Sequence, residues 1–412
     1  MKGFATRAVH GPLPGRDSHG ALRPPVHDSV SFAFASAQAI ADAFAGRKPA
    51  HSYSRISNPT VEELERRVQL LAGGQGVVAL SSGMAAISAV FLALAGTGTN
   101  VVASRFLFGN TISLLTRTLA PWGLEARFVD MTDPHAVAAA IDHNTRAVFL
   151  ESITNPQLEV CDILAVAALT RERGVPLVLD NTATTFHLCR ARDLGVDIEI
   201  LSSTKYISGG GTSVGGIIID HGLFDWNRSP RLRPCAGQYG PFAFLMTLRR
   251  EVSRNLGACL SPHAASLQIL GLETMELRIE KSCANAMELA LFLGKQPAVR
   301  DVCYPGLAGH PHHHTAQRQF ADRYGGILTF DLADSGACFR VLDRLRVIQR
   351  ATNINDNKTL ALHPASTIFT EFAPEERKAM GVRDTMIRLS AGIENAEDLH
   401  NDLLQALEGA KK

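Results

Sequence analysis

Short apolar runs alternate with longer amphipathic stretches through the first half of the chain. A buried strand is predicted where several consecutive residues are mostly apolar and a polar residue follows or closes the run. Such runs lie at 77–80, 100–104, 126–130, 147–151, 176–180 and 214–220. Helices are predicted between them, at 60–71, at 81–94, and after Asn110, Pro134 and Asp162. This alternation is typical of an α/β fold with a doubly wound, mostly parallel sheet.

The helix predicted at 60–71 has a recognisable start. Thr60 is followed by Glu63, which is the spacing of a capping box, and apolar residues recur at helical intervals after it. We therefore expect this helix to begin at Thr60.

The two ends of the chain differ from this alternating region. Residues 1–59 have weak periodicity and several prolines, so we expect an arm rather than a core element. A long helical pattern from about Val252, a strand at 326–332 and a final strand and helix predict a smaller α/β domain. At 412 residues the chain is too long for one ordinary core. The expected division is an arm at 1–59, a large domain at 60–255 and a C-terminal domain at 256–412.

One further segment, 221–244, has little periodicity and many turn formers, so we expect a loop over the site or at a subunit contact.

Composition narrows the class of protein. The chain has 41 basic and 40 acidic residues and no basic run, which argues against a nucleic-acid surface. No window has the apolar length of a membrane span and the N-terminus lacks a signal-peptide core, so a cytoplasmic protein is expected. The 7 cysteines are scattered without CxxC spacing, which indicates reduced thiols in packing roles.

The stretch SSTKYISGGGTSVGG at 202–216 carries the strongest candidate chemistry. Lys205 lies between small hydroxyls and a run of glycines. A buried lysine that loses its proton is a nucleophile, and its amine forms a Schiff base with an aldehyde cofactor. Ser202 and Thr204 are placed to hold a phosphate, and the glycines permit close approach of backbone to a ligand.

A carboxylate at a strand end completes this chemistry. Asp180 closes the strand at 176–180, and ligands of open α/β sheets bind at the carboxyl ends of strands. Pyridoxal phosphate requires a lysine, an acid that keeps its ring nitrogen protonated and a phosphate cradle. The amides of Gly83 and Met84, at the start of the helix predicted at 81–94, are expected to donate to that phosphate.

These motifs, in this order, resemble one known family over nearly the whole chain. YSRISNPT, SSGMAA, LFGNT, ITNP, DNT, SSTKY, HPAS and RLSAGIE are similar to the transsulfuration family of pyridoxal-phosphate enzymes. The stretches GGGTSVGGIIIDHGLFDW and ATNINDNKTLALHPAST most resemble its O-acetylhomoserine sulfhydrylase branch. The resemblance implies the fold type I architecture of PLP-dependent transferases, with pyridoxal phosphate as cofactor and no metal.

The resemblance also implies that two chains share each site. The arm would cross to a neighbouring subunit, where Tyr53 and Arg55 bind the cofactor phosphate and Tyr53 also contacts the substrate and takes part in catalysis. Arginine suits a phosphate because its planar group donates two parallel hydrogen bonds. A homodimer is then the minimum assembly, and a homotetramer is expected.

Further site residues follow from the resemblance alone. Phe108 would stack on the cofactor ring and Asn155 would contact its ring oxygen. Arg388 and Asn353 would bind the α-carboxylate of an amino-acid substrate, Arg388 through a bidentate pair.

The implied activity is γ-replacement on an O-acylated homoserine, with sulfide or a thiol as the nucleophile. The alternative is a γ-lyase acting on methionine, cystathionine or a related amino acid. Phe108 stands where much of the family has tyrosine, and phenylalanine cannot protonate a leaving group. Acetate leaves readily as an anion whereas a thiolate benefits from an acid, so Phe108 favours an acyl substrate. Tyr53 is the other candidate for that acid.

Three more residues depart from the family pattern. Relatives usually have an aromatic residue, a proline and a glycine where this chain has Ala183, Phe186 and Asn355. These changes concern the pocket for the acceptor nucleophile.

Other classes are less well supported. A dinucleotide-binding oxidoreductase would need GxGxxG after its first strand, which the chain lacks. A non-catalytic descendant is disfavoured because Lys205, Asp180, Arg55 and Arg388 all remain. The histidines of GHPHHHTA, which are His310, His312, His313 and His314, invite a metal interpretation, but contiguous histidines point in different directions and a loop or helix start is preferred.

Overall fold

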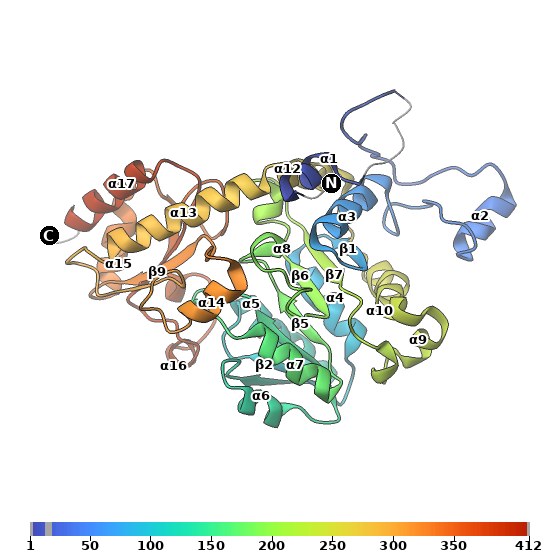
Figure 1. The fold of residues 1–412 in the computed structure, drawn as a ribbon, viewed down its shortest axis with the longest axis horizontal. Coiled ribbons are helices and arrows are strands. Elements are labelled where there is room, and N and C mark those ends of the chain that lie inside the picture. The colour runs from blue at the N-terminus through green and yellow to red at the C-terminus, as the bar shows by residue number, and fades with distance from the viewer. Residues whose placement is uncertain (1–2, 13–18, 410–412) are drawn as a thin grey trace.

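The computed structural model describes residues 3–12 and 19–409, which form two β-sheets with helices packed against them (Figure 1). Parts of the predicted arm, 1–2 and 13–18, and the end of the predicted C-terminal domain, 410–412, lie outside the described residues.

The larger sheet has seven strands in the order β1-β7-β6-β5-β4-β2-β3. Its strands are β1 (Gly76–Leu80), β2 (Thr99–Ser104), β3 (Leu124–Val129), β4 (Thr145–Glu151), β5 (Leu177–Asp180), β6 (Ile198–Leu201) and β7 (Gly216–Asp220). Only β7 runs antiparallel to its neighbours, β1 and β6, and the other pairs are parallel. The predicted α/β fold with a mostly parallel sheet is confirmed. β6 was not predicted, because the charged Glu199 interrupts its short apolar run.

The helices that precede or connect these strands follow the predicted alternation, except for the short α8, which was not predicted. They are α3 (Pro59–Ala72), α4 (Gly83–Leu94), α5 (Gly109–Ser113), α6 (Pro134–Ala140), α7 (Ile163–Arg173) and α8 (Thr185–Leu188). The predicted capping box at Thr60 is wrong, because α3 begins earlier. Asn58 is its N-cap and accepts from the Thr60 N–H at 2.9 Å, with Pro59 as the first helical residue.

The N-terminal residues do not all behave as an arm. Helix α1 (Phe4–His10) contacts α3 and α12 (Pro262–Glu273), and Ala8 is buried among them. For these residues the expectation of an arm rather than a core element is wrong. The segment that carries α2 (Ala37–Phe44) matches the expectation better, because α2 has no buried residue and projects from the body at the right of Figure 1.

The predicted loop at 221–244 is largely helical, which corrects that expectation. It contains α9 (Arg233–Tyr239) and the start of α10 (Ala243–Thr247), followed by α11 (Arg254–Leu256). Trp226 and Phe244 are buried and stack with ring centroids 5.1 Å apart. These helices are too short for an apolar period to show in the sequence, and aromatic packing holds them in place.

The smaller sheet has five strands in the order β10-β11-β12-β9-β8. Its strands are β8 (Asp301–Cys303), β9 (Ile327–Asp331), β10 (Gln349–Arg350), β11 (Leu360–Leu362) and β12 (Met386–Ser390). Helix α12 (Pro262–Glu273) precedes this sheet in the chain and packs on α3, beside the larger sheet. The helices around the smaller sheet are α13 (Met275–Leu293), α14 (His313–Phe320), α15 (Ser335–Arg344), α16 (Pro374–Ala379) and α17 (Ala396–Gly409). The predicted final strand and helix are confirmed.

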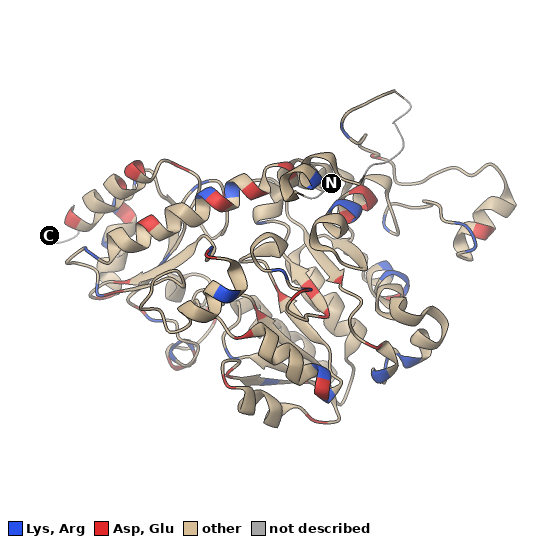
Figure 2. Cartoon of the chain, viewed as in Figure 1, with Lys and Arg blue, Asp and Glu red and all other residues tan. Residues whose placement is uncertain are grey.

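Side-chain chemistry agrees with the composition. Acidic and basic residues are interspersed along both parts of the ribbon in Figure 2. All seven cysteines are free thiols, and four of them are buried, as the predicted packing role requires, whereas Cys259 is exposed. Among the described residues, no helix has the length and apolar character needed to cross a membrane.

Candidate active site

A cavity of about 630 Å³ lies at the carboxyl ends of β4 and β5. Residues between 352 and 388, from the part of the chain that forms the smaller sheet, line its other side. Ten of the residues predicted from the sequence line it: Gly83, Met84, Phe108, Asn155, Asp180, Ser202, Thr204, Lys205, Asn353 and Arg388. The fold therefore brings together residues that are up to 305 positions apart in the sequence (388 minus 83). Parallel strands end at one edge of a sheet, which explains why this edge holds the polar residues.

Lys205 is on the connection between β6 and β7, just before a short 3₁₀ helix at Tyr206–Ser208. Its Nζ donates to Asn353 Oδ1 at 2.5 Å. Burial and the neighbouring Arg388 guanidinium lower the pKa of Lys205 to about 8, although Asp356 and Asp180 act in the opposite direction. An amine with this pKa has a sizeable neutral fraction near neutral pH, which a nucleophile or base requires.

Asp180 is the last residue of β5 and points its carboxyl into the cavity lining. The Thr182 N–H donates to Asp180 Oδ1 at 3.0 Å. Burial raises the pKa of Asp180, and the hydrogen bonds from Thr182 oppose that rise. A buried carboxyl of this kind suits a cationic N–H group of a ligand, because such a partner stabilises its charged form.

Glu151 also lines the cavity and was missed as a site residue. It ends β4 directly opposite Asp180 in the strand pairing. Its two oxygens accept from the N–H groups of Phe108 at 2.6 Å and Asn155 at 3.2 Å. Burial and the Asp180 carboxyl raise its pKa to about 8. Its position at a strand end was the only signal in the sequence.

The start of α4, with Gly83 and Met84, lines the cavity where we expect a phosphate. Ser82 caps the helix by accepting from Ala85 N–H, and the first N–H groups of a helix have no partner within it. Gly83 packs so closely on Ser202 that a Cβ at Gly83 would lie 2.7 Å from the Ser202 Cβ. Thr204 Oγ1 is already bonded to the Gly215 backbone, as donor at 3.2 Å and acceptor at 3.0 Å.

Arg388, on β12, is a buried guanidinium that no carboxylate pairs with among the described residues. It donates to Asn155 Oδ1 at 3.2 Å and to the backbone oxygens of Thr352 and Asn353, both at 3.1 Å. Burial lowers its pKa to about 10. A buried cation without an acidic partner fits an anionic ligand such as a carboxylate.

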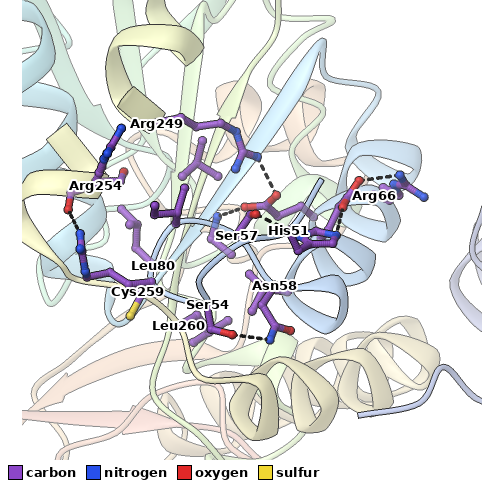
Figure 3. Close-up of a pocket in the computed structure, with 18 of the residues that line it drawn as sticks. His51, Ser54, Ser57, Asn58, Arg66, Leu80, Arg249, Arg254, Cys259 and Leu260 are labelled. Atoms are coloured by element: carbon purple, nitrogen blue, oxygen red, sulfur yellow. Dashed lines mark hydrogen bonds and ion pairs between the residues drawn. The ribbon is translucent and has the colours of Figure 1, made fainter. Parts of the chain in front are cut away.

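Tyr53 and Arg55 do not line this cavity. They follow α2 in the chain, with Arg55 in a turn just after Tyr53, and Arg55 instead lines a second cavity of about 610 Å³, shown with most of its lining residues in Figure 3. Arg55 Nη1 donates to the Arg254 backbone oxygen at 2.5 Å and its guanidinium lies 5.5 Å from the Tyr53 ring centre. Within one chain they are separate from Lys205, and their predicted role in a neighbouring subunit stays a prediction.

The sequence departures have structural explanations. Asn355 has a φ of 55°, in the left-handed region that glycine favours and asparagine tolerates. Ala183 lines the cavity. Phe186 is buried and packs on Phe4 of α1, with ring centroids 6.3 Å apart.

The histidine cluster is at the start of α14, as the preferred interpretation predicted. Residues 3–12 and 19–409 contain no group of three His, Cys, Asp or Glu side chains that could hold a metal ion.

Known proteins resemble this chain over its full length. Residues 5–408 match the family of Cys/Met metabolism PLP-dependent enzymes. L-methionine gamma-lyase of Pseudomonas putida is 38% identical over all of this chain and 98% of its own length. A solved structure of O-acetylhomoserine sulfhydrylase from Wolinella succinogenes is 52% identical, with a TM-score of 0.77 over 86% of this chain and 99% of that one.

Another solved structure matches the fold more completely. A putative O-acetylhomoserine (thiol)-lyase of Campylobacter jejuni has a TM-score of 0.94 at 33% identity, over 98% of this chain and 99% of that chain. That protein carries N'-pyridoxyl-lysine-5'-monophosphate at its position 205.

Proposed function

The chain belongs to the Cys/Met metabolism family of PLP-dependent enzymes, and on that premise we propose that it catalyses γ-replacement on an O-acylated homoserine. Its cofactor is pyridoxal phosphate and its architecture is fold type I. In the proposed reaction, O-acetylhomoserine and sulfide give homocysteine and acetate, or a thiol gives the corresponding thioether. The observation that carries the proposal is the convergence of Lys205, Asp180 and Arg388 on one cavity, in a chain 52% identical to an O-acetylhomoserine sulfhydrylase.

The residues present fit the cofactor. Lys205 would hold it covalently, Asp180 would accept from its ring N–H, and Phe108 would stack on its ring. The amides of Gly83 and Met84 with the hydroxyl of Ser202 would hold its phosphate, and Thr204 would join them by turning its O–H away from the Gly215 backbone oxygen. When bound, pyridoxal phosphate supplies an aldehyde that joins amino groups and a ring that accepts electrons.

Substrate binding rests on Arg388. Its guanidinium is fixed by three hydrogen bonds to neutral oxygens, so its charge is available to an α-carboxylate. Asn353 is the second residue we expect beside that carboxylate, and Asn155 would contact the cofactor's ring oxygen with its amide N–H groups, because its Oδ1 accepts from Arg388.

Lys205 would then move protons within the substrate. Its amine lies in the same cavity as Arg388, and its pKa of about 8 allows it to take a proton from one carbon and return it to another. Departure of the γ substituent as acetate requires no acid, which fits Phe108 in place of a hydroxyl-bearing side chain. Addition of the sulfur nucleophile at the same carbon completes the replacement.

The second candidate is a γ-lyase, which the 38% identity to L-methionine gamma-lyase favours. In that reaction the γ substituent would leave as a thiol and no sulfur nucleophile would replace it, so that hydrolysis by water would give an oxo acid and ammonia beside the thiol. Phe108 argues against it, since a thiolate leaving group benefits from an acid.

We further propose a homodimer at least, and a homotetramer as the full assembly, in which the arm at 1–59 places Tyr53 and Arg55 at a neighbour's site. Their separation from Lys205 within one chain supports this proposal. The division into a large domain at 60–255 and a C-terminal domain at 256–412, and the cytoplasmic location, also belong to the proposal.

Product analysis by NMR tests the proposed reaction. The purified protein is given O-acetylhomoserine with and without sulfide, and methionine in a parallel sample, with Lys205→Ala as the control. Homocysteine that forms only with sulfide, from the unmodified protein alone, is the expected result. An oxo acid and ammonia released without sulfide would overturn the replacement reaction in favour of the lyase.

A further inference from the structure

The loop between β10 and β11 reaches the cavity and places Asn353 against Lys205. Asn353 uses both ends of its side-chain amide there. Its Oδ1 accepts from Lys205 Nζ at 2.5 Å, and its Nδ2 donates to Asp356 Oδ2 at 3.0 Å. The three side chains therefore form a chain of hydrogen bonds that ends at a carboxylate.

Asp356 determines which way the Asn353 amide points. If the amide were reversed, its N–H groups would face the Lys205 ammonium and its oxygen would face the Asp356 carboxylate. Both contacts would then be repulsive, donor against donor and acceptor against acceptor. The observed orientation, with an acceptor toward Lys205, is the one that a negative charge at Asp356 enforces.

Two further contacts hold the Asp356 carboxyl in place. Its Oδ1 accepts from the Lys358 N–H at 3.2 Å. Gly211 packs closely against the other oxygen of Asp356. A Cβ at Gly211 would lie only 2.6 Å from Asp356 Oδ2 and 3.1 Å from Asn353 Nδ2. The glycines after Lys205 therefore leave room for the loop between β10 and β11 to approach. Gly211 has a φ of 69°, which suits glycine.

The charges that face Lys205 come from four parts of the chain: β12, β5, β4 and the loop between β10 and β11. Arg388 from β12 lowers the pKa of Lys205, whereas Asp180 from β5 and Asp356 from the loop raise it. Glu151 from β4 lines the same cavity. Among the described residues, Asp356 is the only one of these carboxylates that a hydrogen-bonded side chain connects to Lys205.

We propose that Asp356 is a positioning residue for Lys205: it orients the Asn353 amide so that its oxygen holds the free lysine amine at one place in the cavity. This inference rests on the proposed role of Lys205 and is independent of which acyl group or nucleophile the enzyme uses. A fixed amine shortens the path of each proton transfer, and the rate of such steps is sensitive to placement.

The test follows the Lys205 amine itself, in the full-length chain from which the cofactor has been removed. Trace acetylation at a series of pH values, read by peptide mass spectrometry, gives the pH at which Lys205 becomes reactive. Because a hydrogen bond to a charged group stabilises the protonated amine, this midpoint should fall by about one pH unit in Asp356→Ala and in Asn353→Ala. Because the Asp356 charge also acts on Lys205 directly, the double variant should fall no further than Asp356→Ala alone.

Asn357→Ala is the matched control. Asn357 is in the same loop and its Nδ2 donates to the Gly209 backbone oxygen at 3.0 Å, but it does not touch Asn353. If loss of loop packing alone mattered, Asn357→Ala would shift the midpoint as Asp356→Ala does, and the proposal would be overturned. The expected midpoint for Asn357→Ala is that of the unmodified chain.

Steady-state kinetics of the loaded enzyme give the second readout. Asp356→Ala should lower kcat by about tenfold or more while KM for the amino acid changes less than about threefold. An unchanged midpoint in Asp356→Ala, or a full additional shift when it is combined with Asn353→Ala, would contradict action through Asn353. Neither outcome would bear on the products seen by NMR, so the proposed reaction is judged separately.

Discussion

At the scale of single residues, Asn355 shows how a departure from a family pattern is accommodated. Its φ of 55° keeps the backbone form that a glycine would adopt. Its N–H donates to Ser390 Oγ at 2.7 Å, and its side-chain Nδ2 donates to the Thr182 backbone oxygen at 3.2 Å. Thr182 in turn donates to Asp180, so Asn355 connects the loop that holds Asn353 to the turn that holds Asp180.

Substitutions at Asn355 separate the backbone from the side chain. Asn355→Gly keeps the left-handed backbone and loses one hydrogen bond, which should lower the free energy of unfolding by about 1 kcal/mol. Asn355→Ala loses the same bond and also carries the strain of a positive φ, so it should lower the free energy by about 2 to 3 kcal/mol. Denaturant unfolding measures both, and equal losses in the two variants would count against the backbone explanation.

The sequence was informative for residues that carry chemistry in a recognisable motif. Lys205, Asp180 and Arg388 could be named because each belongs to a motif next to a predicted strand, and the cavity contains all three. Glu151 and Asp356 could not be named from the sequence. Glu151 accepts from the N–H group of Phe108, which is remote in the sequence, and Asp356 acts by orienting the Asn353 amide. Hydrogen bonds to Phe108 and Asn353 exist only once the fold is formed.

At the scale of elements, strand ends were predicted more reliably than short helices. The strands that end at Glu151 and Asp180 were placed to within two residues at their starts, because each is a buried apolar run with a charged last residue. The helices within 221–244 were missed, since their stability comes from the packing of Trp226 and Phe244 rather than from a repeating pattern.

One element contact gives a testable expectation for the smaller sheet. Asp402 on α17 is buried and accepts from the N–H groups of Arg346, Val347 and Ile348, each at 2.9 Å. These residues lead into β10 and the loop that carries Asn353. Asp402→Ala leaves three N–H groups without their acceptor and should cost about 3 kcal/mol of unfolding free energy.

The control for that variant is on the same helix. Asp398 is exposed in the first turn of α17, so Asp398→Ala should change the free energy of unfolding by less than about 1 kcal/mol. If the two variants lost the same free energy in denaturant unfolding, the three hydrogen bonds would not be the cause of the stability of this segment.

At the scale of the whole molecule, the exposed position of the arm has no explanation within a single chain. Tyr53 is exposed, and α2 has no buried residue and projects from the body (Figure 1). Exposed apolar side chains on a projecting segment are typical of a surface that packs against another subunit. The sequence indicated this only through the family resemblance, because a single chain's periodicity says nothing of its neighbours.

Mixed assemblies test whether sites are shared. Arg55→Ala and Lys205→Ala chains are each expected to be inactive alone. In a dimer of one chain of each kind, one of the two sites would combine an intact Lys205 with an intact Arg55 from the other chain. Random mixing should then restore about a quarter of the unmodified activity. Persistent inactivity in dimers verified to be mixed would contradict sharing.

The central claim is that Lys205 in the cavity beside Asp180 carries the cofactor. The most direct measurement is reduction of the purified protein with borohydride, followed by digestion and mass spectrometry of the peptides. We expect a pyridoxyl group fixed on the peptide that contains Lys205, and none on the Lys205→Ala chain. A pyridoxyl group on another lysine, or no fixed group in a protein that contains pyridoxal phosphate, would contradict the claim.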